Sequence, residues 1–291
     1  MSEVFDFCSR FTADYLAWCQ KHPEVAADED KLEQIFPRQY EKWYASPKSW
    51  LDNKSPNQYF EEIEDAQIYA SMFVSYLEQD IEIPEPLIDC MLHHKEKIYP
   101  ILRNILLIDG TKDIGSEDLD DVRAHIIPLI SEMEMPHPFD RYVSLLRDAE
   151  DVGPLTQELS LILEDPDDLA DTRTKLIDAY STATPVGKEY ILDLLCGYPD
   201  ADEAAYQLLR EEFHNGEMEN AYLCMLAGKL GDERFLPTLR DIMTHEAHDY
   251  FTYTAVKNAI EQISGEILPD KDFSGDPDYD LLAQYERETD E

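Results

Sequence analysis

The chain has 291 residues, of which 64 are acidic and 24 basic, so its formal net charge at pH 7 is −40. A charge of this size repels the phosphate backbone of nucleic acids, which excludes DNA or RNA binding over most of the surface. Hydrophobic residues make up 43% of the chain, and this content predicts a folded protein despite the charge.

The N-terminal half reads as a series of helices. Apolar residues at helical spacing predict a helix over residues 4–20, ended by His22-Pro23, and a second helix over residues 29–44. Ser46-Pro47 and Ser55-Pro56 each resemble a helix start, with serine as the cap and proline at the first helical position. We expect one long helix from Ser55 to the break at Pro84-Glu-Pro86, then helices at 86–108, 116–133 and 138–149, with no strand-like alternation.

Residues 37–54 form a locally basic and aromatic segment in this acidic chain. They include the aromatic residues Trp43, Tyr44 and Trp50 together with four basic side chains, Arg38, Lys42, Lys48 and Lys54. Tryptophan, tyrosine and arginine dominate interface hot spots, so Trp43, Tyr44 and Trp50 are candidate partner contacts. The alternative is internal: the rings pack a corner and the cations neutralise neighbouring acidic helices.

A helical repeat is indicated in the second half. The stretch from Ala221 to Leu239 predicts a helix released by Gly231, a cap at Asp232 and a second helix with Pro237 in its first turns. The same apolar spacing returns at a shift of about thirty residues, as expected of one helical-pair unit. The other copies lie at 155–180, 190–213 and 253–265.

The segment 152–265 resembles HEAT repeats of the short, bilin-lyase-like variety. Residues 228–239, with Leu-Gly-Asp followed by Pro-x-Leu, carry most of the resemblance, and residues 255–265 match the start of another unit. The resemblance implies an all-α fold, a right-handed α-solenoid of antiparallel helix pairs, that binds macromolecules. It brings no shared catalytic residues.

The resemblance also suggests where a partner would bind. In HEAT-like stacks the second helix of each unit usually lines the concave side. On the second helices of this chain, the candidate contacts are Tyr206, Arg210, Arg234 and Arg240.

The sequence predicts three segments. A helical region covers 1–150 and could itself consist of divergent repeats, HEAT-like repeats cover 151–265, and an acidic tail covers 266–291. Proline and glycine interrupt the tail, so we expect it to be partly disordered or to cap the last repeat, with Tyr279, Leu281, Leu282 and Tyr285 available to dock a short helix.

No motif predicts a reaction. His245-Glu-Ala-His248 has a spacing of three where zinc-protease helices need four, and the phosphate-loop, dinucleotide and serine-hydrolase motifs are absent. Five cysteines without a C-x-x-C pair are typical of reduced, buried thiols. We therefore predict no catalytic, cofactor-binding or metal-binding residue.

The first residues lack the pattern of a signal peptide, and no apolar run approaches the ~20 residues of a membrane span. We expect a cytoplasmic, non-enzymatic interaction scaffold whose partner is a protein with a basic or mixed surface, with no nucleic acid and no membrane involved. Two alternatives stay open: an enzyme or accessory that holds a small molecule in the solenoid groove, and an acidic mimic of nucleic acid. The charge could also reflect an acid-rich proteome.

Overall fold

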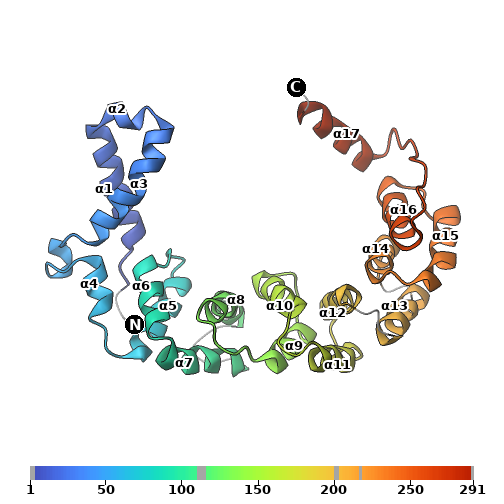
Figure 1. Cartoon of the computed structure of the whole chain (residues 1–291), viewed down its shortest axis with the longest axis horizontal. Helices are drawn as coiled ribbons and strands as arrows, with labels where there is room; N and C mark the ends of the chain where they lie inside the picture. Colours follow the sequence, from blue (N-terminus) through green and yellow to red (C-terminus); the bar gives the residue numbers. More distant parts are fainter. Residues whose placement is uncertain (1–3, 110–115, 200–202, 216–217, 290–291) are drawn as a thin grey trace. The chain divides into compact units, whose positions relative to one another are not determined.

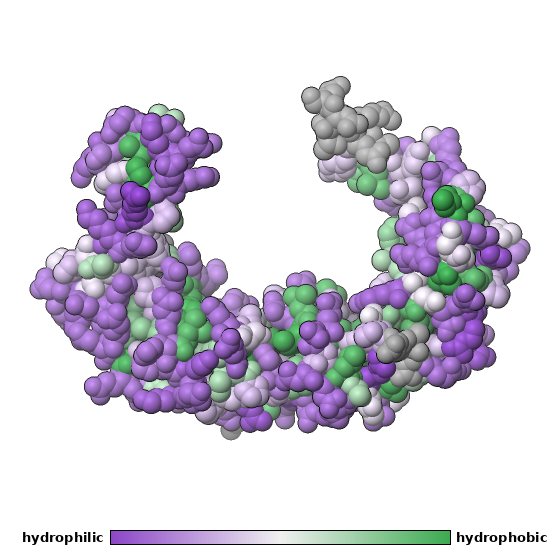
Figure 2. Space-filling view, viewed as in Figure 1, coloured by the Kyte–Doolittle hydropathy of each residue, from purple (hydrophilic) through white to green (hydrophobic). Residues whose placement is uncertain are grey.

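The computed structural model describes residues 4–109, 116–199, 203–215 and 218–289, and within these residues it contains helices and no strand (Figure 1). The all-α prediction is confirmed. The chain divides into two compact units, residues 1–138 and 139–291. Figure 2 shows mainly hydrophilic residues on the visible face of each unit, as the composition requires.

Three helices of the first unit match their predicted ranges. The helices predicted over 4–20, 29–44 and 116–133 correspond to α1, α3 and α8, and each observed end lies within three residues of the predicted one. The helices of this unit are α1 (Phe7–Lys21), α2 (Pro23–Ala26), α3 (Glu29–Tyr44), the 3₁₀ turn η1 (Ser49–Leu51), α4 (Pro56–Glu61), α5 (Ala66–Glu78), α6 (Glu85–His93), α7 (Lys95–Leu107) and α8 (Ser116–Glu132).

The long helix expected after Ser55 is wrong, because the chain forms two helices with a break at residues 62–65. Ser55 does cap α4, in a reciprocal pair with Gln58. The break is held by Tyr69 of α5, whose hydroxyl donates to the carbonyl oxygens of Phe60 at 2.8 Å and Ile63 at 3.0 Å. Phe60 lies in the last turn of α4 and its carbonyl also accepts from the Ile63 backbone N–H at 3.1 Å, whereas Ile63 lies in the break itself.

Two other helix boundaries also differ from the prediction. The Ser46 hydroxyl donates back to the Lys42 carbonyl at 2.5 Å, so Ser46-Pro47 ends α3 instead of starting a new helix. The helix expected over 86–108 is interrupted at His94, whose φ of −102° and ψ of 21° leave the helical range. Lys95, the first residue of α7, donates from its ammonium group to the Met133 carbonyl at 2.9 Å, which fixes the start of α7 against the end of α8.

The second unit contains the predicted helix pairs. Gly231 has a φ of 72° and ends α14, and the Asp232 carboxylate accepts from the Arg234 backbone N–H at 2.9 Å, so the predicted corner is confirmed. Its helices are α9 (Phe139–Arg147), α10 (Pro154–Glu164), α11 (Leu169–Tyr180), α12 (Pro185–Gly197), α13 (Glu203–Asn215), α14 (Asn220–Leu230), η2 (Glu233–Phe235), α15 (Leu236–His245), α16 (Tyr250–Ser264) and α17 (Pro277–Thr289).

Helices α9 to α16 form two layers within the second unit. In Figure 1, α10, α12, α14 and α16 follow one another in one layer and α9, α11, α13 and α15 in the other, and the helices contact their neighbours within and across the layers. Helix α9 contacts α10, α11 and α12, so α9 belongs to the second unit.

Side-chain hydrogen bonds recur at nearly constant separation along the second unit. The Tyr198 hydroxyl donates to the Leu163 carbonyl 35 residues earlier, and the Tyr222 hydroxyl donates to the Glu189 carbonyl 33 residues earlier. The Lys229 ammonium donates to Asp193 36 residues earlier. Each of these bonds therefore joins residues 33–36 apart in the sequence, on α10 or α12 and on or just after the next helix of the same layer.

The segment after α16 packs against that helix. The Phe273 ring is buried between Tyr250 and Tyr253, with ring centroids 5.8 and 5.3 Å away, and Tyr279 lies 5.2 Å from Tyr250. Leu281 and Leu282, which the capping prediction had placed in the same contact, are 54% and 46% exposed.

The role of Tyr69 is testable by replacing it with phenylalanine. Tyr69→Phe removes the hydroxyl donor from the Ile63 carbonyl and one of two donors from the Phe60 carbonyl, so we expect the first unit to lose about 1–3 kcal/mol of unfolding free energy. Tyr99→Phe is the control, because the Tyr99 hydroxyl donates to Pro136 at an exposed site and its loss should cost no more than about 0.5 kcal/mol. Urea unfolding followed by tryptophan fluorescence measures both, since all three tryptophans lie in this unit. Equal effects of the two substitutions would contradict this account of the break.

A second prediction concerns close packing of α12 against the end of α9. A Cβ at Gly187 would lie 2.6 Å from the Leu146 carbonyl oxygen and 2.7 Å from that of Arg147, so Gly187→Ala should cost about 1–3 kcal/mol. A Cβ at Gly197, in the same helix, would meet only the flexible end of Lys229, and Gly197→Ala should stay within about 1 kcal/mol of the wild type. Thermal unfolding followed by circular dichroism compares the two. A Gly187→Ala protein as stable as Gly197→Ala would show that α9 and α12 can move apart freely.

Candidate partner-binding groove

Helix α5 carries no charged side chain from residue 66 to residue 77, in a chain whose charged residues make up 30% of the total. Its large side chains Tyr69, Met72, Phe73 and Tyr76 are buried and hold the helix in the first unit. The side chains on the rest of the helix are also uncharged. The part of α5 that does not pack into the core is therefore an uncharged strip.

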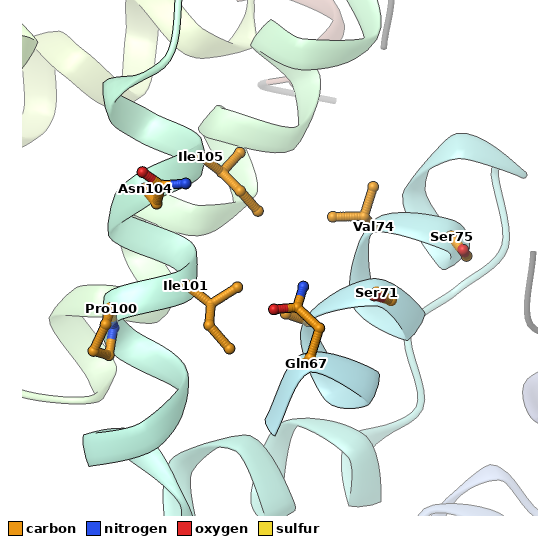
Figure 3. Close-up of a pocket in the computed structure, with 9 residues that line it drawn as sticks. Gln67, Ser71, Val74, Ser75, Pro100, Ile101, Asn104 and Ile105 are labelled. Atoms are coloured by element: carbon orange, nitrogen blue, oxygen red, sulfur yellow. The ribbon is translucent and has the colours of Figure 1, made fainter. Parts of the chain in front are cut away.

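Helix α7 packs beside α5 and faces this strip with uncharged side chains of its own. Between the two helices lies an open groove of about 600 Å³ (Figure 3). Nine residues line it, none of them charged: Gln67, Ala70, Ser71, Val74 and Ser75 of α5 and Pro100, Ile101, Asn104 and Ile105 of α7.

The groove has an apolar interior with polar groups beside it. In Figure 3, Ile101 and Ile105 point from α7 toward α5, and Val74 points from α5 toward α7. The side chains of Gln67 and Asn104 are exposed and supply amide hydrogen-bonding groups at the edge. Short side chains such as Ser71 let another surface approach the α5 backbone, and depletion of charge is the composition found at the centres of protein interfaces.

The lining of the groove contains polar amide and hydroxyl groups and no carboxylate, amine, thiol or imidazole. Elsewhere, burial raises the pKa of the Cys196 and Cys224 thiols to about 12, which keeps them protonated at neutral pH. Within the described ranges no group of three or more His, Cys, Asp or Glu side chains is placed to hold a metal ion.

Acidic residues lie at both ends of the groove wall formed by α5. Glu64 and Asp65 precede the helix, and Glu78 and Asp80 lie at its other end, all four exposed. A segment that fills the groove would therefore meet negative charge beyond each end of α5, which favours a segment with basic flanks.

The N-terminal candidate contacts are used mainly inside the protein. Trp43 is 8% exposed and Tyr44 is 2% exposed, and the Trp43 indole N–H donates to the Asp14 carboxylate at 2.7 Å. Trp50 is half-buried, with the Arg10 guanidinium 4.2 Å above its ring. The alternative of internal packing therefore describes Trp43 and Tyr44, and neither offers much surface to a partner.

The candidates of the second unit are more exposed but also engaged. The Arg234 guanidinium lies 3.5 Å from the Tyr206 ring centroid and forms ion pairs with Asp232 at 2.6 Å and Glu203 at 2.8 Å. Arg240 pairs with Glu266 at 2.9 Å, and Arg210 donates to Gln207 at 3.2 Å.

Their position also differs from the expectation. Tyr206 and Arg210 belong to α13, Arg240 belongs to α15, and Arg234 lies in η2, directly before α15. In Figure 1, α13 and α15 lie on the outer side of the curve formed by the helices of this unit. Helices α12, α14 and α16 lie on the inner side, so the expectation that second helices line a concave face is wrong for this unit.

The groove itself was not predicted from the sequence. The signal that could have found it is the uncharged run 66–77, which the sequence shows directly. Which face of that run stays open depends on how α7 packs, and this information is not contained in the pattern of α5 alone.

Comparison with protein-family models, curated proteins and solved structures gives no match. No helix in the described part of the chain has the length and apolar character needed to cross a bilayer.

Proposed function

We propose that this chain is a non-enzymatic helical-repeat scaffold that binds another protein, and that the groove between α5 and α7 receives an apolar segment of that partner. The observation that carries the proposal is the uncharged lining of the groove in a chain that is 30% charged. An open strip of this kind on an otherwise acidic surface is costly in water, and a covering partner removes the cost.

The partner is expected to be basic around an apolar centre. The formal charge of −40 attracts cations at long range, and the acidic residues at the two ends of α5 favour basic flanks beside the apolar segment. An amphipathic helix meets both requirements, because such helices dock in grooves through one apolar face.

The HEAT resemblance supports a binding role as well. Residues 228–239 carry the motif, and we take the helix pairs of the second unit as α-solenoid repeats acting in a cytoplasmic protein. The uncharged groove favours protein binding over the two alternatives, an enzyme or accessory holding a small molecule and an acidic mimic of nucleic acid.

Photo-crosslinking from the groove tests the proposal. A photoreactive benzoylphenylalanine at exposed positions 71 or 104 should crosslink to the same partner in native cells, whereas the same group at exposed Gln34 of α3 should not. The partner's peptide found at positions 71 and 104 should be an apolar segment with basic flanks.

Ser71→Arg supplies the quantitative test. The arginine fills the groove with a charge, so the affinity of the purified partner should fall at least tenfold, about 1.4 kcal/mol. Gln34→Arg adds the same charge outside the groove and should leave the affinity within twofold. Crosslinks that do not depend on position, or a partner that binds Ser71→Arg normally, would refute docking in the groove.

A further inference from the structure

A column of stacked rings runs along one face of α1. Phe11, Tyr15, Trp18 and His22 follow at helical spacing, and successive ring centroids lie 5.7, 6.0 and 4.3 Å apart. The planes of each successive pair are within 22° of parallel. The first three of these rings also line a small pocket of about 200 Å³.

The opposite wall of this pocket comes from α3 and the turn after it. The lining residues on this side are Gln39, Lys42, Trp43, Ser46 and Lys48. The Lys48 Nζ atom lies 3.9 Å from the Trp43 ring centroid, so one cation is already seated on the aromatic wall.

The pocket has a positive balance in a strongly negative chain. Its one carboxylate, that of Asp14, accepts the Trp43 indole N–H at 2.7 Å. Neither Lys42 nor Lys48 forms an ion pair within the part of the chain that the structure describes. Burial lowers the pKa of Lys48, while the Asp14 charge acts in the opposite direction. Two basic residues and one acidic residue therefore line this space.

We propose that this pocket binds a carboxylate attached to a small aromatic or apolar group. The carboxylate pairs with Lys42 and Lys48, and the attached group lies against the rings of Tyr15 and Trp18. A cation is disfavoured, because Lys48 occupies the position over Trp43 that a cation would take. The volume is below the roughly 300 Å³ at which drug-sized ligand pockets begin, so it accommodates one residue or one small acid.

This ligand chemistry has two sources, a free aromatic acid or the terminal residue of a peptide. The full-length chain reports on both, because two of its three tryptophans, Trp18 and Trp43, line the pocket and Trp50 is the only other one that contributes to the fluorescence. The probes are phenylacetate and a short peptide ending in phenylalanine with a free carboxylate. Their controls are phenylacetamide and the same peptide as its amide.

We expect a saturable change in tryptophan fluorescence with the acids that weakens as salt is raised, and no saturable change with the amides. Lys42→Gln and Lys48→Gln should each weaken binding about tenfold, while Lys21→Gln, a charge removed from the end of α1 outside the pocket, should not. Because Lys42 is exposed, Lys42→Gln is expected to fold even if Lys48→Gln loosens the turn. Binding of phenylacetate identifies a free acid as sufficient, and binding of the peptide alone identifies a chain terminus; either supports the proposal.

Three results would overturn it: no binding by either acid, equal binding by acid and amide, or tighter binding by phenethylamine. The Ser71→Arg protein should bind the acids normally, since its substitution lies in the groove. Ligand binding in the pocket and partner binding in the groove are therefore tested independently of each other.

Discussion

Burial of apolar side chains between short neighbouring helices has to overcome a strong internal repulsion. With 64 acidic and 24 basic residues, the folded chain concentrates negative charge, and this opposes any compact state. Most of the described helices have 13 residues or fewer, too few to be stable in isolation, so they depend on the apolar faces they share with their neighbours. In the second unit the buried Leu159, Leu176 and Leu209 belong to such faces on α10, α11 and α13.

The scarce basic residues of the second unit are placed where they reduce that repulsion most. Lys175 of α11 meets Asp140 of α9, Lys229 of α14 meets Asp193 of α12, and Arg234 meets Glu203 of α13. Each pair is exposed and by itself contributes little to stability. Because each pair joins two different helices, together they neutralise charge at contacts between helices of this unit.

Much of the fold could be predicted from the sequence because local signals determine it. Gly231 and Asp232 specify a corner through backbone geometry and capping, and Ser55 specifies the start of α4. The break between α4 and α5 could not be predicted in this way, since it depends on a hydroxyl from the next helix, that of Tyr69, which donates to the carbonyls of Phe60 and Ile63. The candidate contacts show the same limit: composition identifies Trp43 as suited to an interface, but only packing decides whether that interface is internal.

The small number of basic residues, most of them in internal contacts, also explains why we propose an uncharged surface for partner binding. Arg234 and Tyr206 have the chemistry of interface hot spots, yet their cation–π contact and the two ion pairs of Arg234 already join parts of the second unit. A partner that used them would have to replace these contacts, so little net affinity would result. A partner that binds in the groove between α5 and α7 breaks no ion pair, because the residues that line the groove are uncharged. In a chain whose few cations are largely committed to internal contacts, an uncharged surface is the one that a partner can cover at the lowest cost.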